Sequence, residues 1–149
     1  MRKIIEYLKN PTYRVSIIIS FLKKYKKNKF IKLYFRKKLI KNYGIYIGKN
    51  CVIGDNFRIV HPNGVVIGDK CIIKNNVTVY HQVTLGSKYG DGEGYPTLEN
   101  NVIIFPGAKI IGNITIGENS IIGPNSVVIS NVESNSIYSG FPACKIKDV

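Results

Sequence analysis

His61 and His81 are the two histidines of this chain of 149 residues. An imidazole titrates near neutral pH and can take a proton from a hydroxyl group, which contributes a factor of about 10² to 10⁴ in rate. His61 stands in FRIVHPNGVVIG, just before the turn-forming residues Pro62, Asn63 and Gly64. General-base chemistry is therefore one interpretation of His61, and a surface histidine that precedes a turn is the other.

A six-residue repeat indicates which elements position these histidines. Aliphatic residues recur every six positions over residues 47–59, 67–85 and 98–128, and glycine often follows them. A period of six does not suit a helix, but it suits short strands separated by tight corners. The sequence therefore predicts a mainly β protein, a parallel solenoid whose stacked coils bury the aliphatic side chains.

Two interruptions of the repeat indicate where a site lies, because an inserted residue must leave the coil surface. The step from position 59 to 67 is eight residues and contains His61. The step from position 85 to 98 is thirteen residues and contains SKYGDGEGYPT, whose glycines favour a mobile lid. His81 follows His61 by one coil of eighteen residues plus the two inserted ones. We therefore expect the two histidines to be neighbours in successive coils.

The repeats carry a family resemblance over residues 44–147. This part of the chain resembles the left-handed parallel β-helix acyltransferases built on hexapeptide repeats, and HPNGVVIGDKCIIKNNVTVYHQVTLG, GAKIIGNITIGENSIIGPNSVV and GFPACKI are most similar to the serine acetyltransferase branch. The left hand comes from the resemblance alone, since general crossover rules favour a right-handed path. The resemblance implies that His61 is the general base that deprotonates an acceptor hydroxyl as it attacks the thioester of acetyl-CoA.

Three positions depart from the serine acetyltransferase pattern. Tyr46 and Val60 stand where that branch has carboxylates, and Tyr95 stands where it has a loop histidine. An amino-acid acceptor needs a charged partner for its ammonium group, and two obvious partners are lost. Tyr46 and Tyr95 can instead bind a sugar, or they are ordinary surface aromatics. The departures favour a carbohydrate hydroxyl as the acceptor, as in the related sugar and capsular-polysaccharide acetyltransferases.

The resemblance also implies where the co-substrate binds. Acetyl-CoA is expected in a groove between the subunits of a homotrimer, held mainly by backbone groups of the later coils. Four positions carry this expectation: Gly107, Ala108, Ser126 and Lys145, the last as a point charge for a CoA phosphate. Each is equally compatible with plain coil sequence or, for Lys145, with a solvated charge.

The remaining chemistry-bearing residues are assigned more simply. His81 is expected along the acceptor cleft or in a structural role. No metal is expected, because a catalytic site takes three ligands and the chain has no third histidine. Cys51 and Cys71 are expected in the core and not as nucleophiles. The group that orients the general base stays open between Asp55, Asp91 and a neighbouring subunit.

The first 44 residues differ from the rest in charge. They hold 14 of the 22 Lys and Arg residues and a single acid, Glu6, whereas residues 45–149 have eight basic and eight acidic groups. Apolar residues recur at helix-like intervals between these lysines, and the run VSIIISFL is too short to span a bilayer. We therefore expect a basic amphipathic helical arm over residues 1–44 and a β-helix acyltransferase domain over residues 45–149.

Three roles are open for this arm: contact with an anionic membrane, contact with an acidic polymer, or a cap over the end of the solenoid. Capping with added peripheral membrane attraction is favoured, because solenoids need caps and basic amphipathic helices are attracted to anionic lipids. A lipid-linked glycan acceptor would explain both. Nucleic acid is the weaker option, since no recognised motif is present. The expected location is cytoplasmic, with peripheral association at the inner face of the membrane.

The sequence thus predicts an acetyl-CoA-dependent O-acetyltransferase with His61 as base. The favoured acceptor is a carbohydrate hydroxyl in capsule, exopolysaccharide or lipopolysaccharide assembly. Serine acetylation in cysteine biosynthesis is the enzymatic alternative. A hexapeptide-repeat scaffold without catalysis is the third possibility, and it would neither bind acetyl-CoA nor release CoA.

Overall fold

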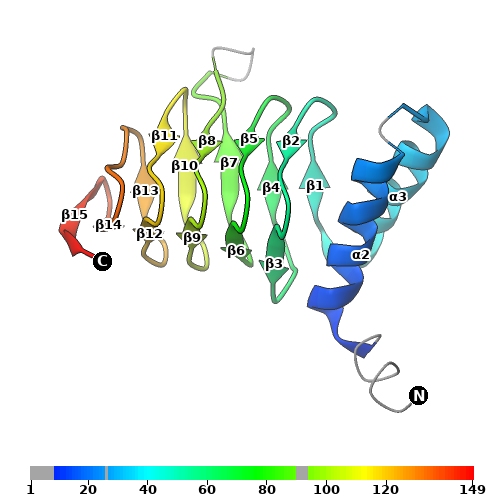
Figure 1. The fold of residues 1–149 in the computed structure, drawn as a ribbon, viewed down its shortest axis with the longest axis horizontal. Coiled ribbons are helices and arrows are strands. Elements are labelled where there is room, and N and C mark those ends of the chain that lie inside the picture. The colour runs from blue at the N-terminus through cyan, green and yellow to red at the C-terminus, as the bar shows by residue number, and fades with distance from the viewer. Residues whose placement is uncertain (1–8, 26, 90–93) are drawn as a thin grey trace.

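The computed structural model describes residues 9–25, 27–89 and 94–149. Within these ranges two helices, α2 (Pro11–Lys24) and α3 (Lys29–Tyr43), precede a rod of short strands (Figure 1). The strands are β1 (Tyr46–Ile47), β2 (Val52–Ile53), β3 (Arg58–Val60), β4 (Val66–Ile67), β5 (Ile72–Ile73), β6 (Thr78–Tyr80), β7 (Thr84–Gly86), β8 (Thr97–Leu98), β9 (Ile103–Ile104), β10 (Lys109–Ile111), β11 (Thr115–Ile116), β12 (Ile121–Ile122), β13 (Val127–Val128), β14 (Ser136–Gly140) and β15 (Ala143–Asp148).

These strands form three sheets that run along the rod. The first sheet has the order β1-β4-β7-β10-β13, the second β11-β8-β5-β2, and the third β15-β14-β12-β9-β6-β3. Neighbouring strands of a sheet belong to successive coils and pair in parallel, except for the antiparallel pair β14–β15 among the described strands. The chain is mainly β, a left-handed parallel β-helix with helices at its N-terminal end, so the predicted fold class is confirmed.

The six-residue repeat produces the core of this rod. Its aliphatic side chains point inward from every coil and are at most 1% exposed: Ile59, Ile67, Ile73, Val79, Leu85, Leu98, Ile104, Ile110, Ile116, Ile122 and Val128. Cys71 is also buried among them. Because a strand alternates inward and outward residues, each hexad contributes this aliphatic residue and, in most coils, a second buried residue two positions before it, such as Val65, Val77 and Val83.

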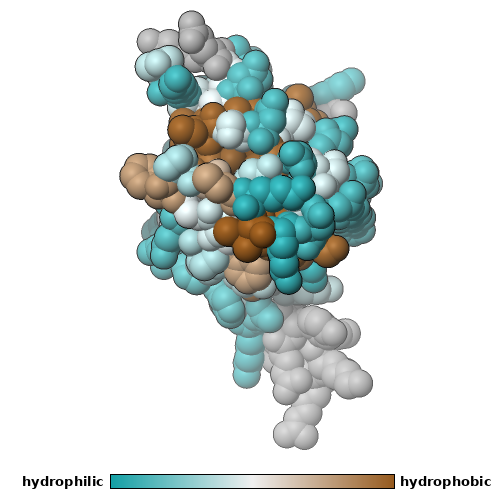
Figure 2. All heavy atoms as spheres, turned by 90° about the vertical axis from the view of Figure 1, so that its left-hand side faces the viewer, coloured by the Kyte–Doolittle hydropathy of each residue, from teal (hydrophilic) through white to brown (hydrophobic). Residues whose placement is uncertain are grey.

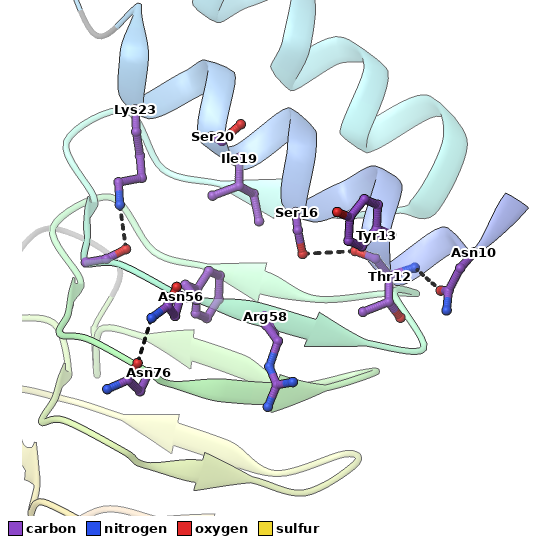
Figure 3. A pocket seen from close by; sticks show the side chains of 12 residues that line it. Asn10, Thr12, Tyr13, Ser16, Ile19, Ser20, Lys23, Asn56, Arg58 and Asn76 are labelled. Atoms are coloured by element: carbon purple, nitrogen blue, oxygen red, sulfur yellow. Dashed lines mark hydrogen bonds between the residues drawn. The ribbon is translucent and has the colours of Figure 1, made fainter. Parts of the chain in front are cut away.

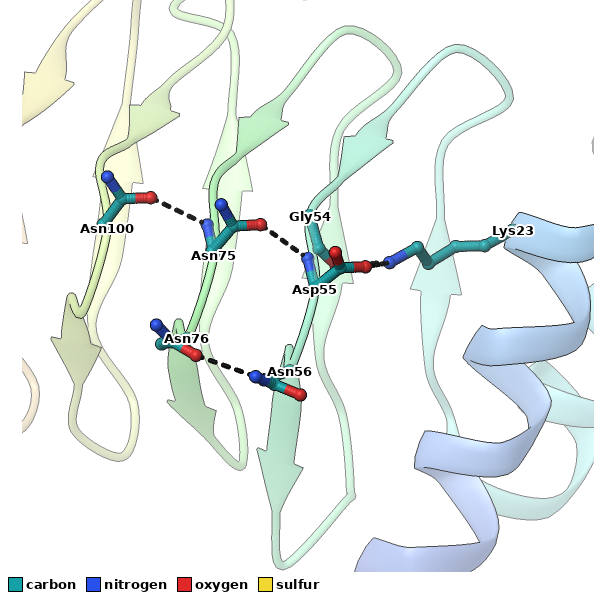
Figure 4. Close-up of polar contacts among 7 residues, drawn as sticks. All are labelled: Lys23, Gly54, Asp55, Asn56, Asn75, Asn76 and Asn100. Atoms are coloured by element: carbon teal, nitrogen blue, oxygen red, sulfur yellow. Dashed lines mark hydrogen bonds and ion pairs between the residues drawn. The ribbon is translucent and has the colours of Figure 1, made fainter.

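Asparagine side chains form a ladder along one corner of the rod. Asn56, Asn76, Asn101, Asn119 and Asn135 lie at equivalent positions of successive coils, with φ values between 55° and 60°. Each Nδ2 donates to the Oδ1 of the next rung over 2.8–3.1 Å, and Figure 4 shows the first such pair. Asparagine tolerates left-handed backbone better than most residues, so it suits these tight corners.

The two helices begin and end where the sequence supplies caps. The side chain of Asn10 accepts a hydrogen bond from the backbone N–H of Thr12 at 2.9 Å, and that of Asn28 accepts from Ile31 at 3.1 Å. Helix α3 ends at Gly44, whose left-handed φ of 62° suits glycine. Strand β1 begins two residues later. The division into an arm of residues 1–44 and a solenoid of residues 45–149 stays a prediction.

The helices cover the first coil of the solenoid. Buried side chains of both helices belong to the same hydrophobic cluster as the coil interior: Val15, Ile18, Ile19, Leu22 and Leu39. Three cations reach carbonyl oxygens at the corners of this coil. Lys23 donates to Gly54 and Arg36 to Gly48, both at 2.8 Å, and Lys32 lies 3.5 Å from the oxygen of Lys49. The helices thus occupy the capping position expected for the arm.

The opposite end of the rod is closed by strands alone. Strand β14 pairs in parallel with β12, and β15 folds back antiparallel onto β14. Figure 2, which views the molecule from this end, shows hydrophobic and hydrophilic side chains interspersed. Ile129, Phe141, Ile146 and Val149 are exposed hydrophobic residues of this region.

Candidate active site

His61 directly follows β3, at the corner where the chain passes from the third sheet to the first. Its side chain is exposed, and its φ of 51° lies in the left-handed region. The other non-glycine residues with positive φ among those described are six asparagines and Gln82. Holding a histidine in this region costs on the order of 1–3 kcal/mol, and such strain is concentrated at functional sites. The two-residue insertion therefore places an imidazole outside the coil at an energetic cost.

His81 lies beside His61 in the next coil, as predicted. Strands β3 and β6 pair with Val60 opposite Tyr80, so the two histidines follow in register. Their ring centroids are 6.3 Å apart, with the rings 67° from parallel. The Nδ1 atom of His81 is buried and has no hydrogen-bond partner. A buried ring nitrogen without a partner is uncommon and indicates a polar group that a ligand or a neighbouring chain can satisfy.

Two aromatic rings extend this site along the third sheet, a feature that the sequence analysis missed. Tyr80 and Phe105 stack with centroids 5.2 Å apart and planes 5° from parallel, and Tyr80 lies 6.5 Å from His61. Both belong to outward positions of successive coils. The half-buried stack thus lies beside His61 on the third sheet.

Tyr46 and Tyr95 are placed by different elements of the chain. Tyr46 projects outward from β1 and is 46% exposed. Tyr95 is half-buried, and its ring covers Gly68, where an added Cβ would meet the ring at 2.3 Å. Gly68 follows β4, so Tyr95 lies at the corner between the first and second sheets. His61 lies at a different corner, between the third and first sheets.

The positions expected to hold acetyl-CoA offer mainly backbone. The side chains of Ala108 and Ser126 are fully buried, and Ser126 Oγ accepts from the N–H of Gly140 at 3.1 Å. The N–H of Gly107 donates to the carbonyl of His81 at 3.0 Å, which links this segment to the histidine pair. A Cβ at Gly107 would lie 2.0 Å from Asn125 Oδ1, so the position needs glycine.

Lys145 is already engaged with carboxylates. Its Nζ lies 2.9 Å from Asp148 and 2.8 Å from Glu133. The hydrogen bond to Asp148, and to a smaller extent that to Glu133, raises the pKa of Lys145 above its ordinary value. A CoA phosphate at this position would have to compete with both acids.

The orienting group for His61 does not come from Asp55 in this structure. Asp55 lies at the opposite end of β3 and pairs with Lys23 at 2.5 Å, and that hydrogen bond lowers its pKa (Figure 4). Asp91 belongs to residues 90–93 of the predicted lid, which lie outside the described residues. None of the four ion pairs among described residues includes either histidine.

Metal binding and a thiolate nucleophile at Cys51 or Cys71 find no support in the described parts of the chain. No group of three or more His, Cys, Asp and Glu residues within them is placed to hold a metal ion. Burial raises the pKa of the Cys51 and Cys71 thiols to about 12, so neither is a thiolate near neutral pH.

A groove of about 620 Å³ lies between α2 and the first coils (Figure 3). It is lined by Asn10, Thr12, Tyr13, Ser16, Ile19, Ser20, Lys23, Gly54, Asn56, Phe57, Arg58 and Asn76. Lys23, at the end of α2, contacts Asp55 before β3. From there α2 runs back past β3. On the solenoid side the groove is lined from Gly54 to Arg58 and by Asn76, and His61 is not among its lining residues.

Comparisons with known proteins agree with this architecture. Residues 44–81 match the family model described as hexapeptide repeat of succinyl-transferase, and residues 95–130 match bacterial transferase hexapeptide (six repeats). The chain is 42% identical to a serine acetyltransferase of Staphylococcus xylosus over 105 residues, which are 70% of this chain and 39% of that protein. It is 44% identical to one from Mycobacterium tuberculosis over 100 residues, which are 66% of this chain and 44% of that protein.

Solved structures give the same result. The serine acetyltransferase of Brucella abortus strain S19 superposes with a TM-score of 0.76 at 32% identity, covering 86% of this chain and 52% of that one. A serine acetyltransferase solved in complex with CoA gives 0.73 at 30% identity, covering 85% and 51%. This chain thus spans only part of the length of the proteins that it matches. The repeats and the fold together place its solenoid in the hexapeptide-repeat transferase family.

Proposed function

We propose that this chain is an acetyl-CoA-dependent O-acetyltransferase with His61 as its general base. The observation that carries the proposal is His61 itself, an exposed imidazole held at a φ of 51° by an insertion in the repeat. The comparisons support it, because the relatives are named serine acetyltransferases and one solved neighbour is a complex with CoA.

The chemistry is a direct transfer. Neutral His61 accepts the proton of the acceptor hydroxyl while the oxygen attacks the thioester carbonyl of acetyl-CoA. The tetrahedral intermediate collapses as the C–S bond breaks, and the departing thiolate takes the proton back from the imidazolium. Atoms and charge balance without a covalent enzyme intermediate, which agrees with the protonated state of the Cys51 and Cys71 thiols.

Acetyl-CoA is proposed to lie against the later coils in a homotrimer, between neighbouring subunits. Gly107 supports this placement, because its N–H contacts the carbonyl of His81 beside the proposed base. Ala108 and Ser126 would contribute backbone groups only, since their side chains face the interior. Lys145 would contribute after exchanging a carboxylate partner for a phosphate.

The acceptor best supported by the comparisons is serine, which the sequence analysis ranks second. The relatives and the solved neighbours reported above carry the name serine acetyltransferase. The sequence match to two of these relatives spans 70% and 66% of this chain. In this proposal a residue other than Tyr46 and Val60 binds the ammonium group of serine, because neither of these two side chains carries a charge.

A carbohydrate hydroxyl is the second candidate, and specific residues favour it. Tyr46, Val60 and Tyr95 are uncharged at positions where the serine acetyltransferase branch has carboxylates and a histidine. The groove between α2 and the first coils is larger than serine needs, and its hydroxyl, amide and aromatic groups suit a glycan.

The test is CoA release from acetyl-CoA by the purified chain, with serine and a panel of sugars and oligosaccharides as acceptors. His61→Asn is the informative variant, because asparagine tolerates the left-handed backbone while removing the base. We expect kcat to fall by about 10² to 10⁴ with an unchanged thermal unfolding midpoint.

His81→Asn is the matched control, since it makes the same change one coil away. We expect it to raise the KM for the acceptor more than it lowers kcat. Equal losses of kcat in both variants would contradict His61 as the single base. Turnover on serine or on a glycan identifies the acceptor. If calorimetry detects no binding of acetyl-CoA, both enzymatic proposals fail and the chain is a scaffold without catalysis.

A further inference from the structure

The outer face of α3 exposes large apolar side chains between lysines. Phe30 is 87% exposed, Tyr34 61%, Leu33 53% and Ile40 50%. Exposure of this much apolar area on one short helix is unusual for a surface that faces only water. The lysines on the same face are exposed as well. We call Phe30, Leu33, Tyr34, Lys37, Ile40 and Lys41 the α3 outer face.

Helical geometry places these six residues on one side. At 3.6 residues per turn, Phe30, Lys37 and Lys41 point in nearly the same direction, flanked by Leu33 and Ile40 on one side and Tyr34 on the other. The opposite side of α3 carries buried Leu39, and Arg36, on the flank next to Ile40, reaches the carbonyl of Gly48. The first coil therefore packs against the inner side of α3, and none of the described residues buries its outer face.

The charge around this face is of one sign. From Tyr7 to Gly44 the sequence has no Asp or Glu. The four ion pairs found among the described residues include no lysine of α3. An anionic surface would meet these cations without first displacing an acidic partner, and each lysine near an anionic bilayer strengthens binding by about fivefold.

We propose that the α3 outer face docks on an anionic lipid surface. Phe30, Leu33 and Tyr34 enter the region of the lipid headgroups, and Lys37 and Lys41 pair with phosphates around them. Helix α3 then lies in the plane of the membrane, with its inner side still packed on the first coil. No helix in the described ranges is long and apolar enough to cross a membrane. This docking does not depend on the acetyltransferase activity.

A single tryptophan reports on the proposed contact. The chain has no tryptophan, so Phe30→Trp introduces the sole one, and Val52→Trp is a control at a solenoid position that is 58% exposed. Both full-length variants are mixed with vesicles of phosphatidylcholine alone or with phosphatidylglycerol added. We expect a blue shift of the emission for Phe30→Trp with the anionic vesicles only, and none for Val52→Trp. Equal shifts for the two variants, or no shift for Phe30→Trp, would overturn the proposal.

Vesicle co-sedimentation separates charge from apolar insertion. Lys37→Gln with Lys41→Gln is expected to weaken partitioning about 25-fold at low salt, while the same change at the exposed solenoid lysines Lys70 and Lys147 weakens it much less. Equal losses in both pairs would mean attraction by net charge alone and would contradict docking through α3.

Leu33→Ser with Tyr34→Ser tests the apolar part. We expect loss of vesicle binding with an unchanged thermal unfolding midpoint and an unchanged oligomeric state by sedimentation velocity. If this variant changes the oligomeric state and leaves vesicle binding intact, the face is a contact between copies of the chain. If short RNA displaces the protein from anionic vesicles, and the Leu33→Ser, Tyr34→Ser variant loses RNA binding as well, the face is a nucleic-acid surface. Either result overturns the proposal.

Discussion

The first coil of the solenoid meets two helices, whereas the last coil meets a hairpin of strands. At the helical end, Val15, Ile19 and Leu39 are at most 2% exposed and continue the core beyond the coils. At the hairpin end, Ile146 is 62% exposed, and β15 contributes backbone pairing to β14 instead of apolar burial. One end is closed mainly by the hydrophobic effect and the other mainly by hydrogen bonds and charge.

This difference follows from what each end leaves unpaired. The first coil exposes the edge of all three sheets together with a cross-section of the core, and helices can cover both at once. At the last coil the edge of the third sheet is carried by β15, whose exposed Lys145 and Lys147 discourage pairing with another strand. The helical end is therefore expected to govern global stability, and the hairpin end to govern local opening.

The largest expected effect comes from shortening one aliphatic side chain of equal size at each end of the solenoid. Leu39→Ala is expected to cost about 2–5 kcal/mol of unfolding free energy, because its side chain is fully buried between the helices and the first coil. Ile146→Ala is expected to change it by less than about 0.5 kcal/mol. Urea unfolding followed by circular dichroism measures both. Similar losses for the two variants would mean that the hairpin supports the core as much as the helices do.

A smaller test concerns the cations that contact carbonyls of the first coil. Arg36→Met removes the hydrogen bond to Gly48 while keeping most of the side-chain volume, and we expect a loss of about 1–2 kcal/mol. Arg58→Met on β3 is the control, since Arg58 makes only a 3.4 Å contact with Thr78, and it should be nearly neutral. A neutral Arg36→Met would show that apolar packing alone closes this end.

Much of the fold followed from the repeat. The spacing of the inward aliphatic residues predicted the coils, and the step of twenty residues predicted that His61 and His81 would be neighbours, which their 6.3 Å ring separation bears out. The amphipathic pattern of the first 44 residues predicted helices near the solenoid end. These features depend on local periodicity, which a single sequence contains.

Other features depended on register across insertions or on side-chain contacts between elements. Tyr80 and Phe105 are twenty-five residues apart because the predicted lid lies between them, so counting coils of eighteen could not reveal their stack. Lys145 pairs with Glu133 and with Asp148, three residues further on. The fold of the β14–β15 hairpin brings these groups together, so the sequence alone could not distinguish a paired lysine from a solvated one. The acceptor-binding roles of Tyr46 and Tyr95 stay predictions.

The smallest expected effects are pH dependences of opposite sign at the two ends. Near the helices, the backbone N–H of Lys49 hydrogen-bonds to Asp69, and this contact together with that from Asn50 lowers the pKa of Asp69. A lowered pKa in the folded state stabilises the protein above the ordinary pKa of about 3.9, and this stabilisation is lost as the pH falls through the folded value. The benefit of Asp69 over Asp69→Asn should therefore shrink at pH 3.

At the hairpin end the raised pKa of Lys145 acts in the opposite direction. Its contribution is complete below the ordinary lysine pKa of about 10.4 and is lost as the pH rises through the higher folded value. The thermal unfolding midpoints of the wild type and Lys145→Met should differ slightly at pH 7 and converge in strong alkali. Both pairs are exposed, so the shifts will be small and will decrease with added salt. If Lys145→Met instead lowers the midpoint equally at every pH, the side chain stabilises the hairpin through packing, and the electrostatic half of the comparison between the two ends fails.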